Sequence, residues 1–459
     1  NAPHDDTLFY RLGQQFSAFN WLGRYNSGTF LKGPIFPFFI GFAEILNIPF
    51  RLLESFLVVA ASTYFILNLK KLQLDKLFLI IIFCFLIFYP FVNSVSNYRL
   101  LREIIYPWFL LLVFSELILI YFNVKNNSNF ETFFLNSLRL GFFLFLFWNT
   151  REEGLFIIPG FVFAFLLLTL FFFKKIKKII FVFFVSLSFL FFFNLMLKNI
   201  NSYVYGYPVI VEFKDKNYIR GMNAFYRVKQ NVDYEFAAPS KETWKKIFKN
   251  SKTAQKLEEF VFGPQYYGWS QMACANLNNS HWENHGFKKR YNCKGRMPAG
   301  FMLFAIRDAF LPLGLNSPKK ISNFLNNIHL EIDSACKNGK LDCHNIPDIL
   351  IPFETYSTKI MLESLKLLPL SLKTSFIIPF PAPNSTFSNG SDEDLSEMAK
   401  NLKAKVFPTY KLQNENYLKK LNINNEFKKY FLTKDFLDNS ALDYVKYNRH
   451  GILEIKGFI

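Results

Sequence analysis

Two adjacent carboxylates, Asp5 and Asp6, stand at the start of the chain, ahead of several apolar runs long enough to cross a bilayer. A carboxylate at the edge of a membrane is costly to place, so its presence indicates a function. The segment that this pair opens, residues 1–40, alternates charged with aromatic side chains, as expected in the interfacial zone. A reaction at a lipid headgroup needs acid–base groups at this depth. The alternative is a helix N-cap ahead of Thr7, although a cap needs only one aspartate.

Arginine and glutamate follow in a later loop, residues 93–108, where they could bind phosphate. Arg99 and Arg102 are three residues apart and Arg99 and Glu103 four apart, so they share a face if the next helix begins early. The planar guanidinium group of arginine donates two hydrogen bonds to a phosphate at once. We therefore predict that this loop contributes to a phosphate-binding site.

A further loop, WNTREEGLF, places Arg151 directly before Glu152 and Glu153. These side chains could line the same cavity as those of the preceding loop and the acidic pair. The alternative for each arginine is to lie at the interface and pair with Glu103, Glu152 or Glu153, which would stabilise a helix bundle without binding a ligand.

The elements that must position these groups are apolar runs of near-spanning length. With 51% hydrophobic residues and 60 Phe the chain is too apolar for an ordinary soluble protein, and its charged residues are too many for a wholly embedded one. A spanning helix needs about 20 apolar residues. Runs of this kind predict six spanning helices, at 50–69, 76–95, 104–124, 132–148, 155–173 and 179–198. A shorter run at 35–48, which contains Pro37, predicts a re-entrant or interfacial helix.

Lysines mark one side of this predicted bundle. They lie in alternate short loops, as Lys70, Lys71, Lys76, Lys125, Lys174, Lys175, Lys177 and Lys178. By the positive-inside rule these loops are cytoplasmic, which places the acidic pair, both arginine loops and everything after about residue 200 on the opposite side. The net charge of +18 arises largely beside apolar runs and carries no nucleic-acid-binding signature, so we expect a membrane and not a nucleic acid as partner.

Three stretches, in this order, resemble the GT-C class of membrane glycosyltransferases, which includes relatives of protein O-mannosyltransferases and aminoarabinose transferases. HDDTLFYRLGQ is similar to the acidic motif of the first external loop, LKGPIFPFF to its Lys-Pro-Pro segment, and TREEGL to a later Arg-Pro-Glu-Gly stretch. Gly33 and Glu152 replace prolines of these motifs. The helix that the family places before the acidic loop is missing from this sequence, which begins with Asn and which we interpret as a fragment or a processed form.

The resemblance, which covers about the first 200 residues, implies that Asp5 or Asp6 is the catalytic carboxylate. It also places Lys32 and Arg151 near the phosphate of a polyprenyl-phosphate sugar donor, with one of the two glutamates at 152–153 close by. The transfer needs a base for the incoming hydroxyl and cations for the charge that grows on the departing phosphate. Some members of the class use a divalent metal, for which the acidic pair and His4 could supply ligands.

After about residue 200 the sequence predicts a water-soluble, α-rich α+β region. The predicted elements are a strand at YPVIVEF and helices at 217–230, 240–262, 299–312, 318–338 and 354–373. The predicted domains are 1–49, an external acidic loop; 50–199, the bundle; 200–380, an external domain; and 381–459, a linker and a small terminal unit. Arg307 and Asp308 are expected to form a buried structural pair. The aromatic residues Tyr266, Tyr267 and Trp269 could stack on sugars or belong to the core.

Four of the five cysteines lie in the external region, which predicts disulfides in an oxidising compartment. The simplest connectivity pairs Cys274 with Cys293 and Cys336 with Cys343. The alternative is a zinc site built from Cys336, Cys343 and His344, but no paired C-x-x-C spacing accompanies it.

The sequence thus predicts an α-helical integral membrane protein of a bacterial inner membrane, with a GT-C-like bundle and a periplasmic C-terminal region. The predicted function is transfer of a sugar from a polyprenyl-phosphate donor to an acceptor on the periplasmic side, with Lys32, Arg99, Arg102 and Arg151 as cations near the phosphate. The alternative is a non-catalytic membrane protein whose external domain binds a partner or a cell-envelope polymer. A transporter ranks below both, because few polar residues lie within the runs, namely Asn68, Glu116, Arg139 and Asn194.

Overall fold

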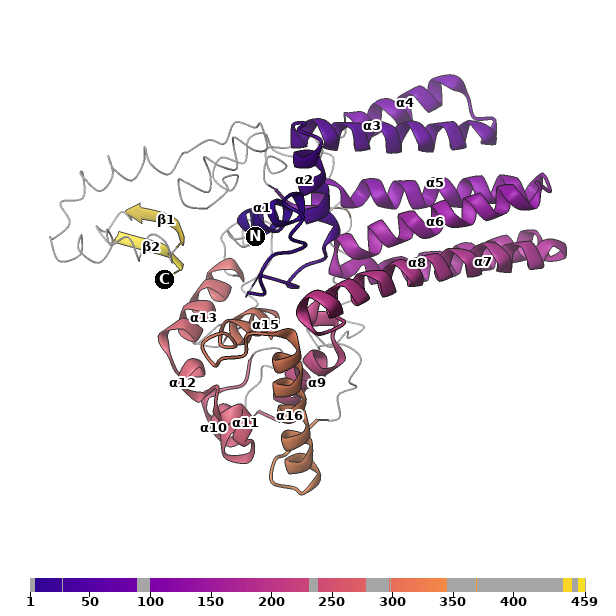
Figure 1. The fold of residues 1–459 in the computed structure, drawn as a ribbon. Coiled ribbons are helices and arrows are strands. Elements are labelled where there is room, and N and C mark those ends of the chain that lie inside the picture. Colours follow the sequence, from indigo (N-terminus) through magenta and orange to yellow (C-terminus); the bar gives the residue numbers. More distant parts are fainter. Residues whose placement is uncertain are drawn as a thin grey trace. The chain divides into compact units, whose positions relative to one another are not determined.

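The chain divides into two compact units (Figure 1). Unit 1 comprises Asn1–Arg24, Lys32–Asn201 and Leu365–Leu421, and unit 2 comprises Tyr25–Leu31, Ser202–Ser364 and Asn422–Ile459. The computed structural model describes residues 5–26, 28–88, 100–230, 238–277, 297, 299–344, 369, 441–447 and 453–458.

Unit 1 is built from helices. Its α-helices are α1 (Asp5–Ser17), α2 (Ile35–Ile45), α3 (Phe50–Leu69), α4 (Lys76–Ile87), α5 (Tyr106–Lys125), α6 (Phe130–Thr150), α7 (Ile157–Phe171) and α8 (Ile176–Tyr205), of which α8 continues into unit 2. Short 3-10 turns are η1 (Lys70–Leu72), η3 (Arg102–Ile104), η4 (Glu152–Phe156) and η5 (Phe173–Lys175).

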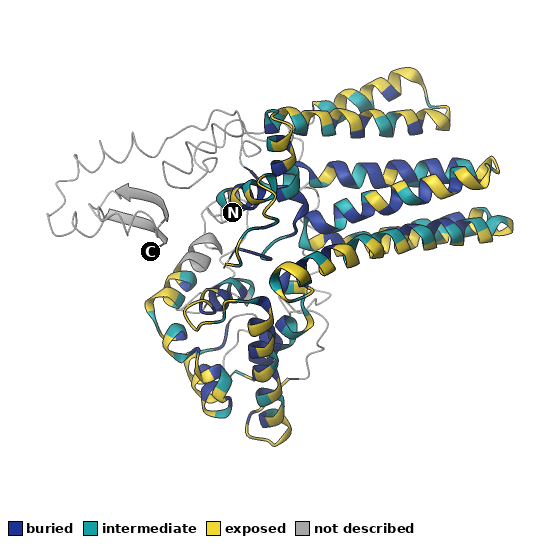
Figure 2. Cartoon of the chain, viewed as in Figure 1, coloured by how far each residue is buried: buried dark blue, intermediate teal, exposed yellow. Residues whose placement is uncertain are grey.

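Five of these helical segments in the described chain are long and apolar enough to cross a membrane. They are Phe50–Leu72, Arg102–Lys125, Phe130–Thr150, Glu152–Phe171 and Phe173–Tyr205. Large apolar side chains such as Phe163, Leu170 and Phe184 are exposed on their outer faces, which suits a lipid environment (Figure 2). The sequence predicted six such helices. In the described part of the run at 76–95, α4 is shorter than a spanning helix, and residues 89–95 lie outside the described chain.

The first two helices of the chain, α1 and α2, cross at a pair of glycines. A Cβ atom on Gly41 would lie 2.5 Å from the carbonyl oxygen of Gly13, so only glycine permits this approach. Phe9 and Phe36 pack edge to face beside the crossing, with ring centroids 5.0 Å apart. The predicted short helix at 35–48 is therefore present as α2, and it fixes the position of α1.

The lysine-rich ends of α5 and α8 meet, as the alternation of the loops predicted. Lys175 Nζ donates to the carbonyl oxygen of Val124 at 2.6 Å, and Lys178 Nζ donates to Asn127 Oδ1 at 2.6 Å. These contacts define the lysine end of the bundle. The arginine end is the opposite end of α5 and α6, where Arg102 pairs with Glu152.

Unit 2 contains mostly short helices. The helices are α9 (Lys216–Arg227), α10 (Lys241–Asn250), α11 (Lys252–Gln255), α12 (Glu258–Val261), α13 (Pro264–Leu277), α15 (Ala299–Asp308) and α16 (Pro318–Lys337), with the turn η6 (Glu212–Lys214). An antiparallel hairpin, β1 (Ala441–Tyr447) and β2 (Leu453–Phe458), lies in the segment expected to hold a small terminal unit.

Three of the elements predicted for this region are wrong or shorter. The strand expected at YPVIVEF is not formed; Val209 and Val211 are buried, but η6 follows at once and no described strand pairs with the segment. The helix expected at 240–262 is divided into α10, α11 and α12, and the helix expected at 299–312 ends at Asp308. The helix expected at 354–373 lies outside the described residues, apart from position 369.

The core of unit 2 forms where α9 packs against α16. A Cβ atom on Gly221 of α9 would lie 2.6 Å from the Cβ atom of Leu325, so the two helices approach closely only because this residue is glycine. Trp244 of α10 and Phe225 of α9 are buried nearby, with ring centroids 5.0 Å apart. The predicted helix at 318–338 is confirmed as α16, which begins after the Ser317 cap.

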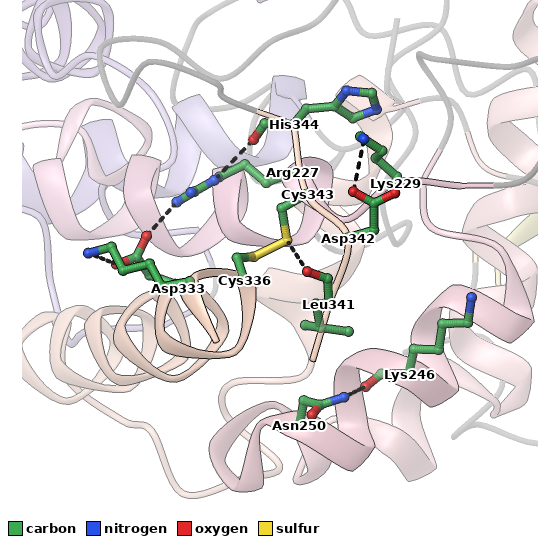
Figure 3. The surroundings of a disulfide bond; sticks show 11 residues. Arg227, Lys229, Lys246, Asn250, Asp333, Cys336, Leu341, Asp342, Cys343 and His344 are labelled. Carbon is green, nitrogen blue, oxygen red and sulfur yellow. Dashed lines mark hydrogen bonds and ion pairs between the residues drawn. A yellow bond between two sulfur atoms is a disulfide. The ribbon is translucent and has the colours of Figure 1, made fainter. Parts of the chain in front are cut away.

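A disulfide between Cys336 and Cys343 closes the end of α16, as predicted (Figure 3). The segment after Cys336 returns alongside the end of α9, where His344 N donates to the carbonyl oxygen of Arg227 at 2.7 Å. Because both sulfur atoms are used in the disulfide, the alternative zinc site loses two of its ligands. Cys293 and the side chain of Cys274 lie outside the described residues, so their pairing stays a prediction.

We expect Glu331→Gln to destabilise unit 2, because the Glu331 carboxylate holds the break between α10 and α11. It accepts hydrogen bonds from Ser251 Oγ at 2.6 Å and from Thr253 N at 2.9 Å. Although burial raises the pKa of Glu331, these bonds lower it below its usual value. The stabilisation is therefore present above the unfolded-state pKa and lost as the pH falls through the folded-state pKa. Thermal unfolding at neutral pH should show a loss of about 1 kcal/mol that shrinks in acid, typical of a lost helix cap.

The matched control for this change is Glu259→Gln, since Glu259 is exposed and its carboxylate makes no such bonds. Equal unfolding temperatures for the two variants would contradict the capping role of Glu331.

Candidate active site

Four segments of unit 1 meet at the arginine end of the bundle: α1, the loop around Lys32, η3 and the residues around Arg151. At the centre, Arg102 Nη1 donates to Glu152 Oε2 at 2.6 Å, and the Arg102 side chain is only 5% exposed. The guanidinium group of Arg102 also lies over the ring of Phe9 from α1, 5.5 Å from its centroid. Arg102 therefore links α1 to the glutamate loop.

Gly33 connects the Lys32 loop to the same glutamate. Its backbone N–H donates to Glu152 Oε1 at 3.2 Å, so Glu152 receives one donor on each carboxylate oxygen. A Cβ atom on Gly33 would lie 2.1 Å from the carbonyl oxygen of Asn149, which no side chain could occupy. A proline at this position, as in the Lys-Pro-Pro segment, would have no N–H to donate. The departure of this sequence from that segment thus has a structural reason.

The neighbouring Arg151 holds two carboxylates. Its Nη1 donates to Glu103 Oε1 at 2.7 Å, while Nε and Nη2 donate to the two oxygens of Glu153 at 3.1 and 3.0 Å. Its guanidinium group lies 5.6 Å from the ring centroid of Tyr106. Burial lowers the pKa of Arg151, but the two glutamates outweigh this and raise the pKa above its usual value, so the group stays charged.

Lys32 adds a third cation to this cluster. Its ammonium group is near enough to Glu152 to attract that carboxylate electrostatically. Lys32, Arg102 and Arg151 bring three positive charges, and Glu103, Glu152 and Glu153 bring three negative charges, so the cluster is neutral before the aspartates are counted. Pairing of the arginines with neighbouring glutamates was the alternative to phosphate binding. Arg102 and Arg151 both form such ion pairs.

The two arginine pairs differ in exposure, and this decides what each can do. The Arg102–Glu152 pair is largely buried, with 5% and 22% of the side chains exposed. The partners of Arg151 are open, since Glu103 is 38% and Glu153 45% exposed. Exposed ion pairs contribute about 0–1 kcal/mol, so a phosphate could replace a carboxylate on Arg151 at small cost. The buried Arg102–Glu152 pair instead holds the segments around Gly33, Arg102 and Arg151 together.

The aspartates lie in the first turn of α1, since this helix begins at Asp5 and not at Thr7. Asp5 is four residues and Asp6 three residues before Phe9, and such spacings share a helical face. Asp5 and Asp6 therefore lie about one helical turn before Phe9, the residue whose ring contacts the guanidinium group of Arg102. The Asp5 carboxylate contacts no hydrogen-bonding partner in the described part of the chain, and the Asp6 side chain lies outside the described residues.

Other predicted site residues fall outside the described chain. Arg99 and His4 are among them, so their places in the site stay predictions. Among the residues that the structure describes, no cluster of three metal-ligating side chains occurs. Two participants were not predicted, Phe9 and Tyr106; each lies in a stretch of aromatic residues that gave no signal of its own.

We expect Gly33→Ala to disrupt this site, because its Cβ would meet the backbone of Asn149 and force the loop away from Glu152. Overpacking of this kind costs about 1–3 kcal/mol. The purified protein should unfold at a lower temperature than the parent chain. Gly160→Ala is the control, since a Cβ there meets nothing within 4 Å. An unfolding temperature unchanged in Gly33→Ala would contradict the close approach.

Comparison of the chain with known protein families, with curated proteins and with solved structures gives no match.

Proposed function

We propose that unit 1 is a GT-C-like glycosyltransferase that moves a sugar from a polyprenyl-phosphate donor to an acceptor at the arginine end of the bundle. The observation that supports this most is that the start of α1 and the segments at Gly33, Arg102 and Arg151 converge at one end of the apolar helices. These are the three stretches on which the resemblance to the class was based, together with the loop of residues 93–108.

In this proposal each group has a distinct role. Asp5 or Asp6 takes the proton of the acceptor hydroxyl as it attacks the anomeric carbon. Lys32 and Arg151 stabilise the charge that grows on the departing lipid phosphate, and Arg151 exchanges an exposed carboxylate for that phosphate. Arg102 and Glu152 are positioning residues, because their buried pair and the Gly33 N–H hold the Lys32 loop beside Arg151.

The side of the membrane is also part of the proposal. The lysine end would face the cytoplasm and the arginine end the periplasm of a bacterial inner membrane. The Cys336–Cys343 disulfide supports an oxidising compartment for unit 2, which would then be the water-soluble external region.

Binding of a polyprenyl phosphate to the purified full-length chain tests the proposal. We expect the phosphate to bind more tightly than the polyprenol that lacks it, and Lys32→Met to weaken binding about tenfold or more, as for loss of a charged hydrogen bond. Lys70→Met is the matched control, because Lys70 lies at the lysine end of α3. Native mass spectrometry of the lipid-bound protein measures each affinity.

The second candidate function is a non-catalytic membrane protein whose external unit binds a partner. The pairing of both described arginines with glutamates favours it, since closed ion pairs stabilise a bundle without a ligand. Equal affinity for polyprenol and polyprenyl phosphate, with no difference between Lys32→Met and Lys70→Met, would support this candidate against the transferase.

A further inference from the structure

A cluster of polar side chains lies inside the spanning helices, far from the arginine end. Glu116 is fully buried halfway along α5. Arg139 of α6 donates from Nε to Glu116 Oε1 at 2.7 Å, and the Tyr64 hydroxyl of α3 donates to the same oxygen. Arg139 also donates to Asn136 Oδ1. Three helices therefore meet around one carboxylate within the apolar bundle.

This cluster joins residues that the sequence showed only as scattered polar positions. Of the four noted within the apolar runs, Asn68, Glu116 and Arg139 belong to it, since Asn68 lies one turn from Tyr64 on the same face of α3. The fourth, Asn194, donates to the carbonyl oxygen of Leu190 in its own helix at 2.8 Å.

Several buried polar atoms of the cluster have no protein partner in the described chain. They are Glu116 Oε2, Asn136 Nδ2 and Asn68 Nδ2, on side chains exposed by 0%, 1% and 4%. One is a hydrogen-bond acceptor and two are donors, so a ligand that satisfies them must both donate and accept. Water has this property, and buried water commonly joins polar groups that proteins leave unpaired.

The cluster is joined to the lysine end by two polar stripes. On α3 and the turn that follows, Tyr64, Asn68 and Lys71 recur at spacings of four and three residues, and Lys71 interacts electrostatically with Glu116. On α6, Thr132, Asn136 and Arg139 recur at the same spacings from the opposite direction. Each stripe therefore begins at the lysine end of its own helix and leads to the cluster.

Toward the arginine end, α6 carries only apolar and aromatic residues between Arg139 and Asn149. In the turn and a half that follows Arg139, α6 presents Leu140, Phe143 and Leu144, of which the two leucines are buried. The ring of Phe143 packs against that of Tyr64, with centroids 6.4 Å apart. On α6 the polar stripe therefore ends at Arg139, whereas on α3 the buried hydroxyl of Ser62 lies half a turn beyond Tyr64.

The charge of Arg139 gives a separate argument for hydration. Its side chain is 45% exposed although it lies ten residues into a spanning helix. A guanidinium group that faces hydrocarbon at this depth is strongly unfavourable, and intramembrane arginines therefore face protein or water. Contact with water would satisfy both the exposed part of the Arg139 guanidinium group and the unpaired polar atoms beside it.

We propose that water enters unit 1 from the lysine end, follows the two stripes and binds at Glu116, forming a dead-end hydrated site in the middle of the spanning helices. Bound water there satisfies Glu116 Oε2 and the two asparagine amides at once. It also gives the Glu116 carboxylate and Arg139 contact with solvent on one side of the membrane only. This site does not depend on the glycosyltransferase proposal, which concerns the opposite end of the bundle.

Thiol reactivity in sealed membrane vesicles tests the proposal on the full-length chain. Asn136→Cys should react with a charged, membrane-impermeant methanethiosulfonate, because a cysteine in water ionises whereas one in hydrocarbon does not. The matched control is Leu135→Cys, since Leu135 is the next residue at the same depth and is 54% exposed on the outer face of α6. Mass spectrometry of the peptide that carries each position gives the rate.

A reference variant defines the side of the reaction without assuming an orientation. Asn126→Cys lies in the turn between α5 and α6, at the lysine end. We expect Asn136→Cys to react about tenfold or more faster than Leu135→Cys, and only when the reagent is on the side that labels Asn126→Cys. Equal rates for positions 135 and 136, or reaction of position 136 only from the other side, would overturn the proposal.

A second pair of variants covers the case in which Asn136→Cys does not fold. Tyr64→Cys on α3 should react faster than Leu67→Cys, even though Leu67 is closer to the lysine end and 58% exposed on the outer face. This order is the reverse of what depth alone predicts. Faster reaction of Leu67→Cys would therefore also overturn the proposal.

Discussion

Replacing Asp5 and Asp6 together by asparagine is expected to abolish sugar transfer while the protein still inserts, folds and binds polyprenyl phosphate. Asparagine keeps the shape of the side chain but cannot accept the proton of an attacking hydroxyl. Loss of a general base typically reduces the rate about 10²–10⁴-fold. Binding should persist, because the proposed phosphate contacts come from Lys32 and Arg151. The measurement is release of polyprenyl phosphate from a radiolabelled pool of lipid-linked sugars in membranes.

The single variants separate the two aspartates, because both lie in the first turn of α1 and only one needs to act as the base. Glu131→Gln is the control, since Glu131 lies in the first turn of α6 at the lysine end. Transfer that continues at the parental rate in the double variant would remove both aspartates from the chemistry, whatever the phosphate-binding result.

Hydrophobic length allowed the sequence to predict most of the bundle. Helices α3, α5, α6, α7 and α8 are each close to a predicted run, because apolar segments of this length have few alternatives to a helix. Cap residues were informative as well, since Ser317 and Pro318 begin α16 as predicted. Apolar length and cap residues are sufficient to predict a helix where no contact with a distant residue interrupts it.

Contacts between distant residues explain the elements that were predicted wrongly. The break at Ser251 exists because the Glu331 carboxylate, 80 residues away in sequence, binds both Ser251 and Thr253. The expected strand at YPVIVEF is replaced by η6 because Glu212 turns inward to Arg307, and its N–H finds a single backbone partner at Phe30. Neither contact leaves a local pattern that a sequence could reveal.

The candidate site was predicted to the level of its segments and not of its pairings. The order of the acidic, lysine and arginine stretches indicated that they meet, and Arg102, Arg151 and Gly33 do converge. Which carboxylate each arginine holds depends on side-chain reach, which spacing does not determine. Arg151, for example, bonds both its near neighbour Glu153 and Glu103 from another loop.

Unit 2 is expected to be destabilised strongly by Arg307→Met, which leaves the Glu212 carboxylate buried without its cation. The sequence predicted a buried pair between Arg307 and Asp308, but this was wrong: Asp308 accepts a hydrogen bond from Trp269, and Arg307 pairs with Glu212 at 2.8 Å. The two side chains are 3% and 4% exposed. Breaking a buried ion pair on one side typically costs about 3–5 kcal/mol.

The surroundings of this pair explain why the loss should be so large. Glu212 Oε1 accepts a hydrogen bond from the Tyr25 hydroxyl at 2.5 Å, and Arg307 Nη2 donates to the carbonyl oxygen of Thr29 at 2.5 Å. Burial lowers the pKa of Arg307, but Glu212 outweighs this and keeps the pKa above its usual value, so the pair is charged. The same pair therefore holds the segment Tyr25–Leu31 in unit 2.

The double variant Arg307→Met with Glu212→Leu distinguishes loss of an interaction from an unpaired charge. Replacing both partners of a buried ion pair by apolar residues is often neutral, so the double variant should regain most of the stability that Arg307→Met loses. A remaining deficit of about 1–3 kcal/mol is expected, because Tyr25 and Thr29 lose their partners. Thermal unfolding of the four proteins of this cycle measures the coupling. If the double variant is less stable than Arg307→Met, the unpaired carboxylate is not the cause of the loss.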